Sequence, residues 1–196
     1  MNINNIGNVD LLLENFLKGD RKSFEKVYKL YYPLLYNYGR QFRIDESTVD
    51  DYIQDIFIDI WNSRDRLNIK MLKPYLLKCL RNKLTKQLVK INKEKDKAEK
   101  YWREEFEISY DPASLGIKLE NQKELETKLA ACIEELSPRQ RELIFLIFYN
   151  DLSYLEAADI LNIKIKTAYN QIHNSILTLR KSLLYLYLGF GLFQYL

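Results

Sequence analysis

The spacing of apolar residues constrains the fold of this chain more than any other feature. In the stretch that contains DDYIQDIFIDIW, apolar side chains follow one another in alternating steps of three and one, at Val49, Tyr52, Ile53, Ile56, Phe57 and Ile60. This spacing places them on one stripe of an amphipathic helix. Similar helical spacing dominates the chain, and the alternating runs bounded by turn pairs that indicate hairpins are missing. We therefore predict an all-α fold.

Changes in composition divide the predicted helices into two small domains. We place the first domain at residues 9–92 and a flexible linker at residues 93–124, which contains the charged run KEKDKAEK and the turn-prone run SYDPASLG. A second compact helical domain covers residues 125–182, and an uncharged apolar tail covers residues 183–196. The first domain should contain four helical stretches, with breaks near Gly19–Asp20, Gly39–Ser47 and Asn62–Pro74.

Composition is typical of a globular protein of a reducing compartment. Of the 196 residues, 47% are hydrophobic and 29% are charged, and Cys79 and Cys132 lie far apart with no CxxC or metal-ligand spacing. The start, MNINNIGNVD, has no basic segment followed by an apolar run, so we expect a cytoplasmic protein.

The uncharged tail at residues 183–196 is shorter than the ~20 apolar residues of a transmembrane helix. We expect a packed or partner-binding tail, with an interfacial membrane anchor as the alternative.

Two capping patterns define the second domain. Ser137-Pro138-Arg139-Gln140 and Ser153-Tyr154-Leu155-Glu156 both offer a serine cap with Gln or Glu three residues later. We predict a helix over residues 154–161, a turn at Asn162, which tolerates left-handed backbone, and a helix from about residue 165 to residue 184. The apolar residues expected between these two helices are Leu155, Ala158, Leu161, Ile163, Ala168 and Ile172.

This arrangement is typical of a DNA-binding helix-turn-helix, in which the second helix enters the major groove. A plain helical hairpin is the alternative. The outward residues early in the second helix would contact DNA. They are Lys164, Lys166, Thr167, Tyr169, Asn170, His173 and Asn174.

The acidic character of residues 50–61 needs its own explanation. This stretch has four aspartates and no lysine or arginine, although the chain has a net charge of +3. Asp51, Asp55 and Asp59 are four residues apart, where like charges repel by a few tenths of a kcal/mol per pair, and the helix dipole helps only the first turn. A cationic partner is the simplest explanation, and a solvated acidic face is the alternative.

A carboxylate metal site of the kind found in helical bundles would need Glu-x-x-His pairs on facing helices. The chain has one histidine, so we expect no metal or other cofactor.

The charge reverses immediately after this helix. Residues 70–100 contain ten lysines and Arg81 against three acids, with Tyr75 in the same run. Trp61, Arg64 and Arg66 lie just before it. Basic residues mixed with aromatic ones suit a nucleic-acid backbone with unpaired bases. We prefer that interpretation for residues 74–88 and a solvated lysine-rich helix for residues 93–100.

Taken in order, these segments resemble bacterial RNA polymerase sigma factors of the extracytoplasmic-function (ECF, sigma-70-like) group. The resemblance depends on four runs: GDRKSFEKVYKLYYPLLYNYG at 19–39, DDYIQDIFIDIW at 50–61, PYLLKCLRNKL at 74–84, and LSPRQRELIFLIFYNDLSYLEAADILNIKIKTAYNQIHNSILTLRK at 136–181. It implies a sigma region 2-like first domain and a region 4-like second domain. Such a factor binds core RNA polymerase and directs promoter recognition, strand opening and initiation.

The resemblance also implies roles for particular residues. In this family the acidic helix docks on the clamp helices of the largest polymerase subunit, here through Asp50, Asp51, Gln54, Asp55 and Asp59. The minus-ten element would be held by Trp61, Arg64, Arg66, Lys73, Tyr75, Lys78, Arg81 and Asn82. The seven outward residues of the last helix would read the minus-thirty-five element, and an anti-sigma factor would be a further partner.

The chain departs from the family pattern in its second domain. Asn162 and Lys164 stand where many members have a turn glycine and a capping serine, and the recognition helix is less basic. Fewer phosphate contacts predict weak DNA binding without polymerase. Asn and Gln side chains pair bidentately with adenine, which predicts an adenine-containing upstream element.

Two other classes of protein remain open from the residues alone. One is a one-component regulator with an N-terminal sensory bundle and the same helix-turn-helix, and the other is a helical adaptor that does not bind DNA. An enzyme is the least favoured class, because we find no catalytic residues and no phosphate loop and expect no small-molecule substrate. We further hypothesise that the tail folds back onto an apolar surface, or that it seats an anti-sigma factor.

Overall fold

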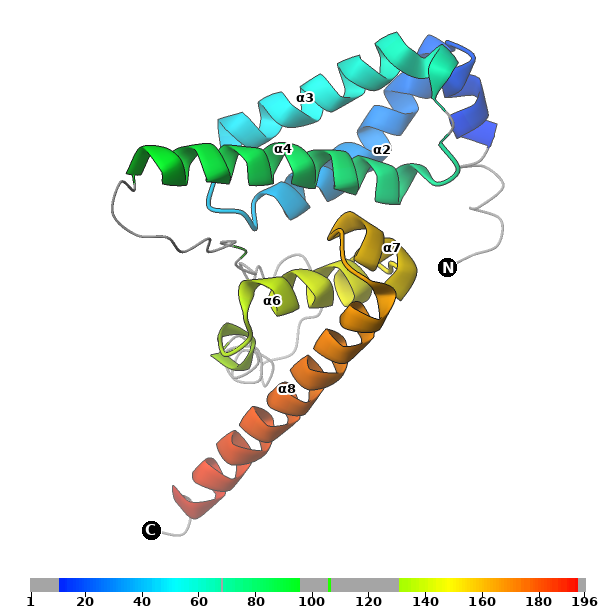
Figure 1. The fold of residues 1–196 in the computed structure, drawn as a ribbon. Coiled ribbons are helices and arrows are strands. Elements are labelled where there is room, and N and C mark those ends of the chain that lie inside the picture. The colour runs from blue at the N-terminus through cyan, green and yellow to red at the C-terminus, as the bar shows by residue number, and fades with distance from the viewer. Residues whose placement is uncertain (1–10, 68, 96–105, 107–130, 194–196) are drawn as a thin grey trace. The chain divides into compact units, whose positions relative to one another are not determined.

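The computed structural model describes residues 11–67, 69–95, 106 and 131–193, with the side chains of 92–95 and 182–193 left out. The chain is all-α and divides into two compact units, Met1–Trp102 and Arg103–Leu196. Figure 1 shows the helices of both units. Within the described residues, no helix is long and apolar enough to cross a bilayer.

The first unit contains a helical segment at residues 11–17 and three longer helices. These are α2 (Arg21–Gly39), α3 (Glu46–Ser63) and α4 (Leu72–Lys95), with a short 3₁₀ turn, η1 (Arg64–Arg66), after α3. Each of the three long helices packs against the other two (Figure 1). The four predicted helical stretches and their three breaks are confirmed.

Local signals start α2 and α3 where the sequence places them. Asp20 caps α2 by accepting a hydrogen bond from the Ser23 amide at 2.9 Å, and Asp45 caps α3 by accepting one from the Thr48 amide at 3.3 Å. These caps satisfy amides that have no partner inside the helix. The apolar stripe of α3 is then buried against α2 and α4, at Val49, Ile53, Ile56, Phe57 and Ile60.

The end of α2 approaches α3 very closely at Gly39. A Cβ atom added there would lie 2.4 Å from Cγ1 of Val49, which is closer than side-chain atoms normally come. Both residues are buried. Glycine is therefore needed at this position for the approach of the two helices, which also positions the first turns of α3.

The second unit contains α6 (Pro138–Ile144), a π-helical turn η3 (Phe145–Tyr149), α7 (Tyr154–Ile160) and α8 (Ile165–Phe193). Both predicted capping boxes form, one between Ser137 and Gln140 and the other between Ser153 and Glu156. Asn162 adopts the left-handed conformation predicted for the turn, with φ of 53°. The helix-turn-helix of α7 and α8 is thus built from local signals.

Four of the six residues expected between α7 and α8 are buried, namely Ala158, Leu161, Ala168 and Ile172, and Ile163 is half-buried. The prediction for Leu155 was wrong, because its side chain is 65% exposed. The buried stripe of α7 runs through residues 157, 158, 160 and 161. At about 100° per residue, Leu155 falls on the far side of the helix from that stripe.

The last helix continues further than predicted. We expected α8 to end near Leu184, but it runs to Phe193 and includes Gly189 and Gly191. A glycine inside a helix costs about 1 kcal/mol relative to alanine, whereas each added residue gains a backbone hydrogen bond. Residues 182–193 therefore extend α8, and the hypothesis that this segment folds back was wrong for that part of the tail.

Candidate nucleic-acid and protein interfaces

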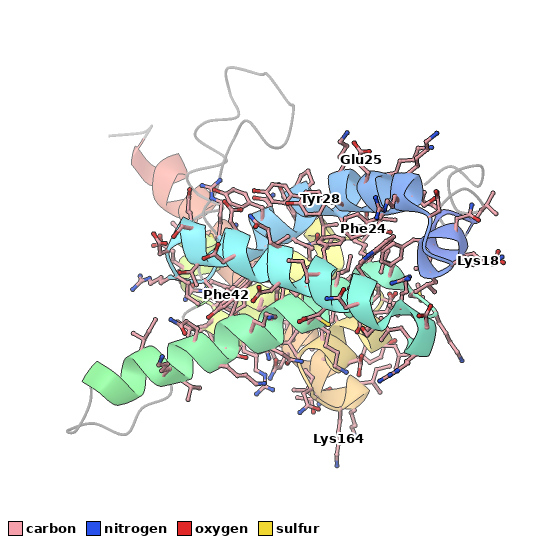
Figure 2. The ribbon with its side chains drawn as sticks, turned by 90° about the horizontal axis from the view of Figure 1, so that it is seen from above. Lys18, Phe24, Glu25, Tyr28, Phe42 and Lys164 are labelled. Carbon is pink, nitrogen blue, oxygen red and sulfur yellow. The ribbon has the colours of Figure 1, made fainter. Side chains whose placement is uncertain are left out.

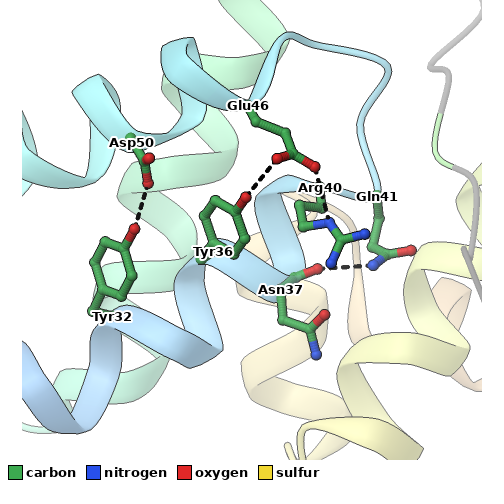
Figure 3. Close-up of polar contacts among 7 residues, drawn as sticks. All are labelled: Tyr32, Tyr36, Asn37, Arg40, Gln41, Glu46 and Asp50. Carbon is green, nitrogen blue, oxygen red and sulfur yellow. Dashed lines mark hydrogen bonds and ion pairs between the residues drawn. The ribbon is translucent and has the colours of Figure 1, made fainter. Parts of the chain in front are cut away.

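The acidic side chains of α3 do not all have the same surroundings. Asp51, Gln54, Asp55 and Asp59 are exposed, whereas Asp50 is half-buried. Asp50 accepts a hydrogen bond of 2.6 Å from the Tyr32 hydroxyl of α2 (Figure 3). This bond favours the neutral phenol beside the carboxylate and raises the pKa of Tyr32 to about 12. Asp50 is therefore held in place by the fold, and the other four side chains form the exposed part of the surface.

A row of tyrosines on α2 lies along the beginning of α3. Ring centroids of Tyr28 and Tyr32 are 5.5 Å apart, and those of Tyr32 and Tyr36 are 5.9 Å apart. The Tyr36 hydroxyl donates to Glu46 at 2.7 Å, and Arg40 Nε lies 3.4 Å from the same carboxylate (Figure 3). Figure 2 shows Tyr28 on the side of α2 that faces α3, while Glu25 projects away from it.

Sequence reasoning missed this tyrosine row and its hydrogen bonds to Asp50 and Glu46 of the acidic helix. The available signal was the four-residue spacing of Tyr28, Tyr32 and Tyr36, matched by Glu46 and Asp50 on the next helix. Residues four apart share a helix face, so two such series on neighbouring helices could have been paired.

A lysine from α4 compensates part of the acidic surface. Lys83 Nζ lies 3.1 Å from Asp55 and 3.8 Å from Asp59, and 5.8 Å from the ring centroid of Tyr52. The sequence argument took a cationic partner as the simplest explanation of the repulsion among the aspartates, with a solvated acidic face as the alternative. The structure adds a third contribution, because Lys83 already relieves part of the repulsion within the chain.

Two residues predicted to contact the minus-ten element pack inside the first unit. Trp61 lies against Phe24 and Phe16, with centroid distances of 5.0 and 6.1 Å. Arg64 stacks over the Trp61 ring at 4.8 Å and donates a 2.6 Å hydrogen bond to the Trp61 carbonyl. Arg66, in the same 3₁₀ turn, is exposed. Trp61 and Arg64 thus fix the geometry of the chain as it leaves α3.

The residues of α4 predicted to contact the minus-ten element also divide into buried ones and accessible ones. Arg81 is only 6% exposed, and Tyr75 is half-buried, with a pKa raised to about 12 mainly by burial and also by neighbouring Cys79. Asn82 is exposed, and Lys73 and Lys78 are partly exposed. The accessible part of this surface is therefore made by the lysines, Asn82 and the nearby Arg66.

The predicted residues of the helix-turn-helix lie together at the start of α8. Lys164, Lys166, Tyr169, Asn170, His173 and Asn174 are exposed, and Thr167 is half-buried. Figure 2 shows Lys164 projecting outward from the turn before α8. One feature was not foreseen: the ring of Tyr169 stacks on Tyr154 of α7, with centroids 4.2 Å apart and planes within 13°.

Family comparisons agree with this two-part arrangement. Residues 27–94 match the family model described as Sigma-70 region 2, and residues 126–179 match Sigma-70, region 4. Together these segments cover more than half of the chain. The chain belongs to the sigma-70 family, in its ECF group. It is an alternative sigma factor, whose two regions bind core RNA polymerase and promoter DNA.

Two solved structures have a similar fold. RpoE of Bartonella quintana, determined in complex with the anti-sigma factor NepR, is 25% identical, with a TM-score of 0.60 over 83% of this sigma factor and 97% of that chain. CnrH, determined with the cytosolic domain of CnrY, is 20% identical, with a TM-score of 0.57 over 88% of this chain and 95% of that one. The likeness to CnrH concerns the fold alone. A comparison with curated proteins finds no match.

Proposed function

We propose that the acidic surface of α3 is the polymerase-binding face and docks on the clamp helices of the largest subunit. The observation that carries this proposal is the exposed row Asp51, Asp55 and Asp59, with Gln54 between them and Asp50 held beside them by Tyr32. Lys83 offsets only part of this charge. Basic side chains of a partner would offset the rest, which chiefly sets orientation and association rate.

The test is a charge reversal with a matched control. The variant Asp51→Lys/Asp55→Lys should lose binding to core polymerase in a pull-down at physiological salt. The control Glu14→Lys/Glu25→Lys changes the net charge equally at two exposed sites, each of which pairs with a lysine of its own helical segment. It should bind nearly as well as the wild type. Normal binding by the α3 variant would refute the docking proposal.

We further propose that η1 and α4 hold the non-template strand of the minus-ten element. Arg66, Lys73, Lys78 and Asn82 would face the strand, and Tyr75 would stack on a base. The packed residues Trp61, Arg64 and Arg81 would hold this surface in shape rather than contact phosphates. Arg66→Ala and Lys78→Ala should each weaken strand opening, measured with 2-aminopurine in the minus-ten element, and each should lower the salt dependence by about one phosphate contact.

The exposed beginning of α8 would read the minus-thirty-five element. Its contact residues would be Lys164, Lys166, Thr167, Tyr169, Asn170, His173 and Asn174. The amides of Asn170 and Asn174 suit adenine edges in the major groove. Replacing adenines in the upstream element should then reduce transcription by the polymerase holoenzyme, and an unchanged response would remove this part of the proposal.

The remaining roles follow from the same proposal. The factor would act in the cytoplasm with residues 9–92 as region 2, 93–124 as linker, and 125–182 as region 4, and it would have no catalytic activity of its own. An anti-sigma factor would regulate it, as the complex of RpoE with the anti-sigma factor NepR suggests. Abortive transcription with core polymerase on a promoter library, at two salt concentrations, tests the whole proposal. Start sites that share two upstream elements would support it, whereas duplex binding without transcription would favour a one-component regulator.

A further inference from the structure

The stacked pair of Tyr154 and Tyr169 joins the two helices of the helix-turn-helix on an accessible side. Tyr154 is the first residue of α7, directly after its cap Ser153, and Tyr169 lies in the second turn of α8. Their rings are nearly parallel at 4.2 Å, yet Tyr169 remains 52% exposed. One face of its ring is covered by Tyr154, while about half of the residue's surface stays accessible.

The stack fixes the position of a side chain that would otherwise move. An exposed tyrosine on a helix surface exchanges between side-chain rotamers, and an aromatic stack of this kind favours one arrangement about two- to tenfold. The ring of Tyr169 is therefore largely in place before any ligand arrives. Preorganisation of this kind improves affinity because less conformational freedom is lost on binding.

The surroundings of Tyr169 are polar and basic. Lys166, Asn170 and His173 lie three residues before, one after and four after it, and all three are exposed. Tyr169 thus places an apolar ring among hydrogen-bonding and cationic groups. On the edges of base pairs in the major groove, the C5 methyl of thymine is the apolar group, and apolar side chains contact it.

We propose that Tyr169 determines specificity by packing against a thymine methyl in the upstream promoter element, and that Tyr154 is its positioning residue. This inference rests on the proposed reading of that element by α8. It adds one base-specific contact, made by Tyr169, and one positioning residue, Tyr154, which acts by holding Tyr169 and does not touch DNA. The hydroxyl of Tyr169 could instead bond a phosphate, which would carry no sequence information.

Replacement of thymine by uracil tests the inference, because uracil lacks only the methyl group. The holoenzyme is titrated with upstream-element duplexes in which each thymine is replaced singly, and binding is measured by fluorescence anisotropy. We expect one position at which uracil weakens binding about three- to tenfold. Tyr169→Ala should abolish this difference, and Tyr169→Phe, which keeps the ring, should retain it.

The positioning role has its own readout. Tyr154→Ala should shrink the thymine–uracil difference at that same position while binding to the uracil duplex stays within about twofold, and Tyr154→Phe should behave like the wild type. Tyr149→Ala is a matched control, since Tyr149 is also a partly exposed tyrosine stacked on a ring, that of Phe145, at 4.8 Å and 16°, but lies outside the two helices. It should leave the difference unchanged.

Each contrary result has a distinct meaning. Promoter-specific binding without any uracil-sensitive position would overturn the inference and leave the proposed function standing. An equal loss of affinity for both duplexes in Tyr169→Ala and in Tyr169→Phe would assign the hydroxyl to a phosphate and overturn the inference. A difference lost in Tyr169→Phe would show that the hydroxyl, and not the ring, carries the discrimination, which also overturns it. Absence of promoter-specific binding to unmodified DNA would refute the proposed reading by α8, and the inference with it.

Discussion

Replacing Gly39 by alanine should force α2 and α3 apart. The new Cβ would lie 2.4 Å from Cγ1 of Val49, whereas ordinary contacts are 3.4–4 Å, so one of the two groups must move by at least about 1 Å. Val49 is fully buried and has no solvent into which it could turn. Overpacking of this kind costs about 1–3 kcal/mol, and the better helix propensity of alanine returns less than about 1 kcal/mol at a helix end. We expect a net loss of about 1–2 kcal/mol.

A second substitution makes the prediction specific to this contact. Val49→Ala removes the clashing methyl group and by itself should cost about 1–2 kcal/mol, because it leaves a cavity. In the double variant the methyl group introduced at position 39 fills part of that cavity. The double variant should therefore be more stable than the sum of the two single effects by about 1–2 kcal/mol, which is the coupling expected between residues in contact.

Urea unfolding followed by Trp61 fluorescence measures these effects in the first unit. The chain has two tryptophans, so Trp102→Phe leaves Trp61 as the reporter, and Trp61 packs on Phe16 and Phe24 of the same unit. Additive effects of the two substitutions, or wild-type stability of Gly39→Ala, would refute the reasoning. Val49 precedes Asp50 of the proposed polymerase-binding face, so polymerase affinity should fall together with stability if that proposal holds.

Three further predictions concern polar contacts. Lys83→Met should lower the unfolding free energy of the first unit by about 0.5 kcal/mol in dilute buffer, because its ion pairs lie near the surface. The loss should disappear at 1 M salt and should shrink in an Asp55→Asn background, where only the longer contact with Asp59 remains. Ser153→Ala should cost about 1 kcal/mol and lower the melting temperature of the second unit in circular dichroism. Ser153→Thr should cost much less, because its hydroxyl can still accept from the Glu156 amide and donate to the Glu156 carboxylate. The folded pKa of Tyr32, raised from 10.0 to about 12, means that stability from its bond to Asp50 is fully present below pH 10 and lost as the pH rises through 12. Tyr32→Phe should flatten the alkaline loss of stability over that range, and an unchanged profile would contradict the assignment.

The helices and their ends, except the end of α8, could be predicted because their signals are local. Caps at Ser137 and Ser153 and the left-handed turn at Asn162 each depend on residues within three or four positions. The contacts that shape the acidic surface are not local. Tyr32 and Asp50 are 18 positions apart, and Lys83 and Asp55 are 28 apart, so pairing them requires the packing of whole helices.

The burial of Arg81 shows how a signal can be present and still be misread. Leu77, Arg81, Leu84 and Leu88 fall at helical spacing, and all four are buried in the structure. The charge of Arg81 favoured a phosphate contact, whereas its position in the stripe favoured the interior. The place of Arg81 in the stripe determined its burial despite its charge, because α4 packs on α2 and α3 along that stripe. For Tyr154 the sequence offered only its place after a cap, which says nothing about the ring it stacks on.

Helix α8 has a geometric consequence beyond its length. Its 29 residues, Ile165–Phe193, form one continuous helix of ~43 Å at 1.5 Å per residue. One uninterrupted helix therefore carries both the exposed residues at its beginning and the uncharged segment after Lys181. Because the helix is continuous, a single residue inserted after Lys181 would rotate residues 183–193 by about 100° about the helix axis relative to the beginning of α8. A partner that binds the far end of α8 would therefore also orient its first turns.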